Sequence, residues 1–154
     1  MPGPLLDRLA EGPIVFDGAM GTLLYSRGVF INRNFDELNL SRPDMVEKVH
    51  EDYLAAGANV LTTNTFGANA ARLARFGLEG KVVEIIAAGV RLAKGVAGDR
   101  AFVAGSIGPT GLIADPWDPP TLDPIREAIR EAAVAMLDAG VDAIVLETFR
   151  SPLE

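Results

Sequence analysis

Four short apolar segments, separated by longer stretches with a helical pattern, constrain the fold of this sequence most strongly. They are Ile14–Phe16, Asn59–Thr63, Ala101–Gly105 and Ala143–Leu146. Each is aliphatic or β-branched and shows no clear alternation with polar residues, which is typical of parallel strands buried on both faces. Strands that alternate with helices in this way predict right-handed βαβ units and a parallel sheet.

The stretches between these segments predict three main helices. We expect Ser41 to cap the first, with Asp44 completing the spacing of a capping box, and Gly57 to end it. The second spans Glu79–Ala97, and the third begins at 123–124 and ends at Gly140. A short extra helix over Ala68–Phe76 and a proline-rich loop over Leu112–Thr121 complete the predicted order.

Two stretches of the chain align with each other at a constant offset. The segment YLAAGANVLTTNTF (Tyr53–Phe66) aligns without gaps with MLDAGVDAIVLETF (Met136–Phe149). Leu, Ala, Gly, Thr and Phe occupy matching positions in the two segments. The polar residue that follows the apolar run differs, because Asn64 aligns with Glu147. The sequence therefore repeats one structural unit, a helix and a strand that presents a polar side chain at its end.

The length and spacing of the chain predict part of a larger barrel. Its 154 residues are enough for one domain with a core. Successive strand ends lie roughly 40–50 residues apart, which suits a (β/α)8 barrel with long loops, but eight such units need roughly 300 residues. We therefore expect an α/β fold in which residues 1–154 form the first half, about (βα)3β, of a (β/α)8 barrel, without a second domain.

The charge and composition exclude several classes of protein. A net charge of −7 and a pI near 4.7 argue against nucleic acid or an anionic membrane as the main partner. The first ten residues lack the basic and apolar regions of a signal peptide, and no apolar run approaches the length of a membrane helix. We expect a cytoplasmic protein. The sequence contains no cysteine, so it has no disulfide and no thiolate metal ligand.

Polar residues follow the predicted strands at the positions where ligands bind in parallel α/β folds. Asp17, Asn64, Ser106 and Glu147 occupy these four positions. The carboxylates of Asp17 and Glu147 could hold a cationic group, such as a substrate ammonium, through charge-assisted hydrogen bonds. Alternatively, Asp17 caps a turn and Glu147 contacts a lysine or a helix N-terminus.

The remaining polar and glycine-rich features leave more than one interpretation open. Asn64 could orient a polar substrate or brace a loop. The glycines of DGAMGT and GSIGPTG could admit a carboxylate or phosphate to the backbone, although they match neither G-x-G-x-x-G nor a P-loop and favour tight turns. We expect His50, the only histidine, to pack against a neighbouring strand, and Trp117 to be a surface aromatic or a lid residue.

Four motifs together resemble the homocysteine S-methyltransferase family. They are DGAMGT, RPDMVEKVHEDYLAAGANVLTTNTFGAN, GSIGPTG and DAIVLETF, which stand in the order of that family between Val15 and Phe149. The resemblance is strongest to the homocysteine-binding domain of the cobalamin-dependent members. It covers nearly the whole chain.

The resemblance implies a (β/α)8 barrel that binds zinc, which lowers the pKa of the homocysteine thiol so that a thiolate can attack a methyl group. It implies that Asp17 and Glu147 hold the amino group, that the backbone of Gly18 to Thr22 takes the carboxylate, and that Asn64 lines the pocket beside the metal. No catalytic residue is assigned. The methyl donor is expected to be methylcobalamin bound by other domains, with betaine or S-methylmethionine as alternatives.

The sequence departs from the family at the metal. The family holds zinc with three cysteines on later strands, and this chain has none. The resemblance therefore implies that the chain is the homocysteine-binding half of the domain and is inactive by itself. Its expected partners are the missing C-terminal half of the barrel, or a second copy of the chain, and the cobalamin domain of the complete enzyme. The alternatives are a flavodoxin-like module that binds an anion at its glycine-rich turns, and a purely structural partner.

Overall fold

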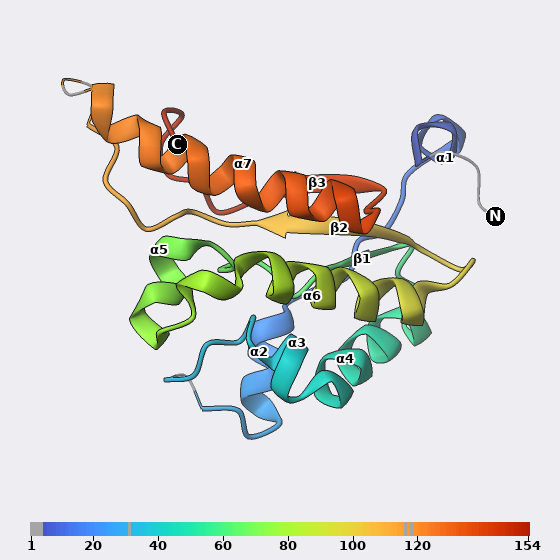
Figure 1. Ribbon diagram of the computed structural model, residues 1–154. Coiled ribbons are helices and arrows are strands. Elements are labelled where there is room, and N and C mark those ends of the chain that lie inside the picture. Colours follow the sequence, from blue (N-terminus) through green and yellow to red (C-terminus); the bar gives the residue numbers. More distant parts are fainter. Residues whose placement is uncertain (1–4, 31, 116, 118) are drawn as a thin grey trace.

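The computed structural model describes residues 5–30, 32–115, 117 and 119–154. Its helices and strands alternate along most of the chain (Figure 1). In chain order they are α1 (Leu5–Glu11), α2 (Met20–Ser26), α3 (Leu38–Ser41), α4 (Pro43–Ala55), β1 (Val60–Thr62), α5 (Ala70–Leu73), η1 (Ala74–Phe76), η2 (Glu79–Lys81), α6 (Val82–Ala97), β2 (Phe102–Ile107), η3 (Pro119–Thr121), α7 (Leu122–Ala139) and β3 (Ala143–Leu146).

The three strands form a parallel sheet in the order β1-β2-β3. Val60 pairs with Phe102, and Ala104 pairs with Ala143. The predicted α/β fold with parallel strands is therefore confirmed. β2 extends two residues beyond its predicted end, so that Ser106 belongs to the strand.

The strand predicted at Ile14–Phe16 is wrong. In the described residues this segment makes only an isolated parallel bridge, between Phe16 and Val60. The N–H of Val15 donates to the side-chain Oδ1 of Asn59 at 3.0 Å, and the N–H groups of Asn59 and Val60 both donate to the Val15 carbonyl. Because a side chain replaces a main-chain acceptor, the regular ladder is interrupted.

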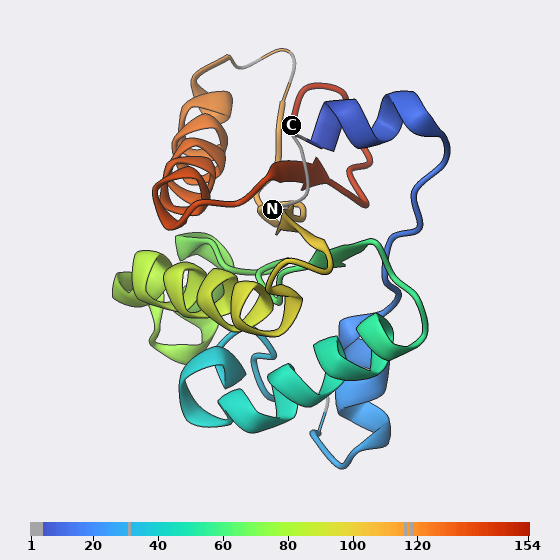
Figure 2. The ribbon, with the colours of Figure 1, turned by 90° about the vertical axis from the view of Figure 1, so that its right-hand side faces the viewer.

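Two helices cover one face of the sheet. α6 and α7 lie side by side on this face (Figures 1 and 2). Ile86 and Val90 of α6, Ile107 of β2 and Met136 of α7 are buried together in the largest part of the core. A Cβ added at Gly105 would lie 2.5 Å from the Met136 sulfur, so the glycine allows the close approach of α7 to β2.

The opposite face of the sheet is covered only in part. Since side chains alternate along a strand, Val103 faces the helices whereas Phe102 and Ala104 face the other side. There they pack with Leu5 of α1, which Figure 2 shows across the strands from α6 and α7. Exposed apolar side chains lie at Val15 and Phe16 beside β1, and at Leu146 of the edge strand β3.

The predicted cap of the first main helix is wrong. Ser41 is the last residue of α3, and its hydroxyl donates to Glu37 Oε2 at 2.9 Å, one turn earlier. Arg42 instead precedes α4 and makes no side-chain capping bond, while Pro43 is the first helical residue. Because the Ser41 hydroxyl is already bonded within this short helix, it does not cap the N-terminus of α4.

The remaining predicted helices are present with shifted bounds. The segment predicted over 68–76 contains α5 and η1 and becomes helical only at Ala70. The segment 79–97 is divided into η2 and α6, and the last helix begins one residue early. In the predicted proline-rich loop, positions 116 and 118 lie outside the described residues, and Trp117 is exposed. Among the described residues, no helix has the length and apolar character needed to cross a membrane.

Candidate functional site

A cleft of about 780 Å³ opens at the carboxyl ends of the strands. Asp17, Gly18, Asn64 and Glu147 all line it, and so does Ser106. Parallel strands end at the same edge of a sheet, so residues far apart in the sequence meet there. The structure does not bring Thr22 to the cleft, because its exposed side chain lies on α2 outside the lining.

Asp17 is held at the end of β1 by Thr62. The N–H of Thr62 donates to Asp17 Oδ2 at 2.7 Å, and the N–H of Asp17 itself donates to the Val60 carbonyl at 3.0 Å. Burial raises the pKa of the Asp17 carboxyl, hydrogen bonds from the side chain and the N–H of Thr62 oppose this, and the negative charge of Glu147 adds to the increase. The two carboxylates therefore lie close enough to interact electrostatically.

Glu147 follows β3 directly and is held from β2. Its N–H donates to the Ile107 carbonyl at 3.1 Å, which continues the ladder one residue beyond the strand. Its carboxylate Oε1 accepts a hydrogen bond from the hydroxyl of Ser106. Thr148 then has a φ of 66°, a conformation rare for a β-branched residue, so the chain turns sharply after the carboxylate.

Asn64 braces a loop with the donors of its amide. Its Nδ2 donates to the Phe35 carbonyl at 2.7 Å and to Asn39 Oδ1 at 3.0 Å. Asn39 Nδ2 returns a bond to the Asn64 carbonyl at 2.7 Å and reaches the Ile85 carbonyl at 3.1 Å. Both Asn64 amide hydrogens are thus used within the fold, which leaves its Oδ1 as the atom that could meet a substrate.

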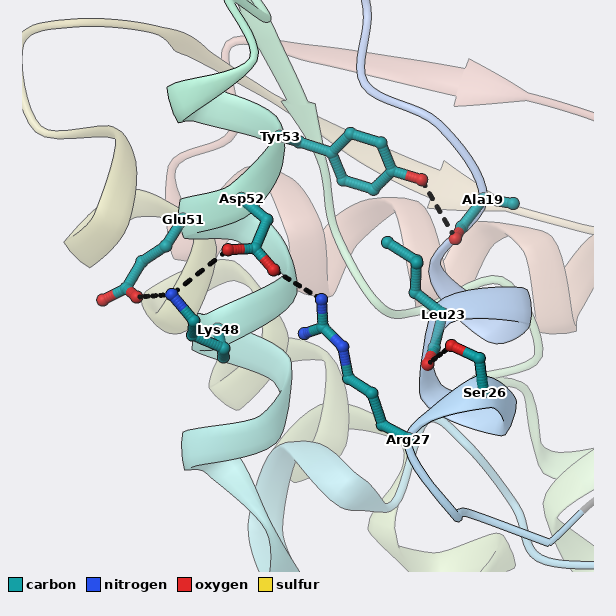
Figure 3. A network of polar contacts seen from close by, with 8 residues as sticks. All are labelled: Ala19, Leu23, Ser26, Arg27, Lys48, Glu51, Asp52 and Tyr53. Carbon is teal, nitrogen blue, oxygen red and sulfur yellow. Dashed lines mark hydrogen bonds and ion pairs between the residues drawn. The ribbon is translucent and has the colours of Figure 1, made fainter.

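The Asp17–Gly18 turn is held by α4 (Figure 3). Tyr53 of α4 points toward this turn, and its hydroxyl donates to the Ala19 carbonyl at 3.2 Å. A Cβ added at Gly18 would lie 2.8 Å from the Tyr53 oxygen, and one at Gly21 would lie 3.2 Å from the Phe35 ring. A side chain at Gly18 would therefore displace Tyr53, and one at Gly21 would need a small shift of the Phe35 ring.

An ion pair fixes α2 against α4 on the same side of the molecule. Arg27, just after α2, donates to Asp52 of α4, which also contacts Lys48 at 3.1 Å (Figure 3). Hydrogen bonds from Lys48 and Arg27 lower the pKa of the Asp52 carboxyl. Since the groups are partly exposed, we expect this pair to orient α2 and to add little stability.

Asp36 and Arg72 also line the cleft, although no sequence pattern indicates a role for either residue. Asp36 Oδ1 accepts from the Gly67 N–H at 2.9 Å, and burial raises the pKa of its carboxyl to about 6. The Arg72 guanidinium lies 5.2 Å from the centre of the Phe66 ring and donates to the Pro109 carbonyl. Asp36 precedes α3 and Arg72 lies on the short helix α5, so only the fold brings the two side chains together at the cleft.

His50, expected to pack against a neighbouring strand, is fully buried on α4. Neither ring nitrogen has a hydrogen-bond partner among the described residues. Burial lowers the pKa of His50 to about 4, so the ring is neutral near pH 7. His50 is not among the residues that line the cleft.

His50 and Asp36 are expected to give opposite pH dependence between about pH 4 and 6. The pKa of His50 is lowered on folding from 6.5 to about 4, so its neutral form stabilises the fold above pH 6.5 and this contribution is lost as the pH falls. The pKa of Asp36 is raised from 3.8 to about 6, so its contribution is present below pH 3.8 and is lost as the pH rises.

Relative to the unmodified chain, His50→Leu should therefore lose stability as the pH rises from 4 to 6, and Asp36→Asn should gain it. Each difference should reach about 2 kcal/mol, given 1.36 kcal/mol per pKa unit. Urea unfolding at four pH values in this range measures both. Parallel curves for the three proteins would contradict the prediction.

The described part of the chain offers no metal site. It contains no group of three His, Cys, Asp or Glu side chains close enough to hold an ion. With no cysteine anywhere in the sequence, the residues present do not fit the zinc site that the resemblance implies.

The site can now be compared with known proteins. Residues 14–154 match the family model for homocysteine S-methyltransferase. The chain belongs to this family. The resemblance carried by the four sequence motifs is therefore confirmed, and the family favours the barrel over a flavodoxin-like module.

Similar proteins cover nearly all of this chain but extend well beyond it. Methionine synthase from Mycobacterium tuberculosis is 35% identical over 97% of the chain, which spans 14% of that protein. The corresponding protein of Mycobacterium leprae is 34% identical, and the chain spans 13% of it. The metallated form of the homocysteine methyltransferase MmuM from Escherichia coli matches with a TM-score of 0.83 and 27% identity, over 98% of this chain and 59% of MmuM.

Proposed function

We propose that this chain binds L-homocysteine as part of an enzyme that methylates the homocysteine thiol to form methionine. The pair of carboxylates at the strand ends carries the proposal. Asp17 and Glu147 lie in one cleft and interact electrostatically, and each has one oxygen held by the fold. The substrate ammonium would bind between them, which balances their charge.

The remaining groups of homocysteine would meet the turn after Asp17 and the end of β1. The main-chain N–H groups of Gly18 to Gly21 would take the α-carboxylate, whereas Thr22 lies outside the cleft lining. Asn64 would offer Oδ1, because its amide hydrogens serve Phe35 and Asn39.

The chemistry of methyl transfer would require groups outside this chain. We propose that residues 1–154 are the N-terminal half of a homocysteine-binding barrel in a cytoplasmic enzyme. A zinc ion would have to be held by another part of that enzyme, and methylcobalamin, the proposed donor, by its cobalamin domain. The chain alone would bind substrate without methylating it.

Calorimetric titration with L-homocysteine and, separately, with inorganic phosphate tests the proposal. We expect heat of binding with homocysteine and none with phosphate. Binding of phosphate alone would refute the proposal and support the alternative of an anion site at the glycine-rich turns.

We further propose that the exposed margins of the sheet seat the C-terminal half of the barrel, or a second copy when that half is absent. Val15, Phe16 and Leu146 expose 60%, 42% and 62% of their surface. β3 lies at the edge of the sheet, and an unpaired edge is a template for association. Sedimentation velocity of the chain should therefore show mass that increases with concentration. A single monomeric species at all concentrations would contradict this.

A further inference from the structure

Three buried hydroxyl-bearing residues link the end of β1 to the end of β3 by hydrogen bonds that pass through the main chain of Ser106. They are Thr63, Thr65 and Ser106, which expose 3%, 2% and 1% of their surface. The hydroxyls of Thr63 and Thr65 lie 2.7 Å apart, and the Ser106 hydroxyl contacts Glu147. Groups this deeply buried need their partners, because a lost bond is not replaced by solvent.

The positions of the hydroxyl hydrogens follow from the bonds. Each hydroxyl has one hydrogen. Thr65 Oγ1 donates its hydrogen to the Ser106 carbonyl at 2.8 Å, so Thr63 must donate to Thr65. Thr63 Oγ1 in turn accepts from the Ser106 N–H at 3.1 Å. The main chain of Ser106 is therefore fixed on both its polar groups by the two threonines.

This arrangement directs the Ser106 hydroxyl at Glu147. Ser106 and Glu147 share the face of the sheet opposite α6 and α7, because Ser106 pairs with Val145, and Glu147 follows it two residues later. The Ser106 hydroxyl donates its hydrogen to Glu147 Oε1, because a carboxylate oxygen is an acceptor. Glu147 Oε2 accepts no hydrogen bond from the described residues and remains for a ligand.

Asp17 is also anchored to the fold, at the end of β1. Its Oδ2 accepts from the Thr62 N–H, and the Thr62 side chain also hydrogen-bonds the Asp17 carboxyl group. Both carboxylates at the cleft are thus oriented by donors from the fold. For Asp17 these donors belong to Thr62, whereas for Glu147, a longer side chain with more rotamers, the donor is the side chain of Ser106.

We propose that Ser106 is a positioning residue, which orients the Glu147 carboxylate toward the ammonium group of the substrate. This inference rests on the proposed function and extends it to a residue that does not itself bind the amino group. Preorganisation of this kind matters because a freely rotating glutamate would have to lose its rotamer freedom on binding.

The test compares L-homocysteine with 4-mercaptobutyrate, which has the same thiol and carboxylate but no amino group. Ser106→Ala should weaken homocysteine binding about tenfold, as expected for one hydrogen bond to a charged group, and leave 4-mercaptobutyrate unchanged. Because Ser106 acts through Glu147, the double variant with Glu147→Gln should bind no more weakly than Glu147→Gln alone. An equal loss for both ligands, or additive losses in the double variant, would overturn the inference.

A matched control is available on the surface. Ser41 also donates to a glutamate, Glu37, at 2.9 Å and lies outside the cleft lining. Ser41→Ala removes the same kind of bond and should change neither affinity. Loss of homocysteine preference in this variant would show that the effect of Ser106 is not specific to the site.

A ligand-free measurement separates this inference from the proposed function and does not depend on the folding of a variant. Scalar couplings in the NMR spectrum of the unmodified chain report the side-chain rotamers of Glu147, and one rotamer is expected. Averaging over several rotamers would overturn the positioning role even if homocysteine binds. A single rotamer without any preference for homocysteine over 4-mercaptobutyrate would leave Ser106 orienting Glu147 and refute the proposed function.

Discussion

Replacing Asp17 by asparagine is expected to lower the affinity of the chain for L-homocysteine by about 10- to 100-fold, and Glu147→Gln should do the same. Each change removes a negative charge from the site proposed for the ammonium and preserves the size of the side chain. The amide oxygen can still accept from the Thr62 N–H at Asp17 or from the Ser106 hydroxyl at Glu147. The fold should therefore be retained, and titration calorimetry at pH 7.5 measures the loss.

Two exposed acidic residues outside the cleft provide controls of matched charge and chemistry. Asp44 lies in the first turn of α4, and Glu84 lies on α6. Asp44→Asn and Glu84→Gln should leave the affinity within twofold of the unmodified chain, since at physiological salt charges beyond about 8 Å are largely screened. Homocysteine binding that survives both cleft substitutions would contradict the proposed recognition of the amino group.

The positions of Asp17, Asn64 and Glu147 were predictable from the sequence because their signal is local. An apolar run followed at once by a polar residue identifies Asp17, Asn64 and Glu147, and the parallel fold then gathers them at one edge. The helices were predictable for the same reason. The observed helix bounds differ from the predicted ones where a neighbouring element uses the same residue. Ser41, for example, belongs to α3 and hydrogen-bonds Glu37, so it does not cap α4.

The partners of these residues were not predictable, because they are fixed by contacts far apart in the chain. The Asn64 amide is used by Phe35 and Asn39, from a segment without a hydrophobic period. Ser106 was placed just beyond its strand, and nothing in the sequence indicates that its hydroxyl meets Glu147. The same holds for Ile14–Phe16, where the side chain of Asn59 interrupts a strand that composition alone predicts.

Asn39→Ala should have the largest effect on stability, lowering the free energy of unfolding by about 2–4 kcal/mol. Asn39 is buried, and its amide bridges the end of β1 to α6. Truncation leaves the Asn64 carbonyl with no side-chain donor and one hydrogen of the Asn64 amide with no acceptor. Urea unfolding followed by circular dichroism measures the change, with Asn32→Ala, at an exposed position, as the control.

Asn39→Asp distinguishes lost hydrogen bonds from lost volume. The aspartate has nearly the same shape and can still accept from Asn64 Nδ2, but it places an oxygen where Nδ2 now donates to two carbonyls. Oxygen against oxygen in a buried site is repulsive, so this variant should be at least as unstable as Asn39→Ala. If Asn39→Asp were instead as stable as the unmodified chain, the bridge would contribute through packing alone. Asn64 would then owe its orientation at the cleft to some other contact.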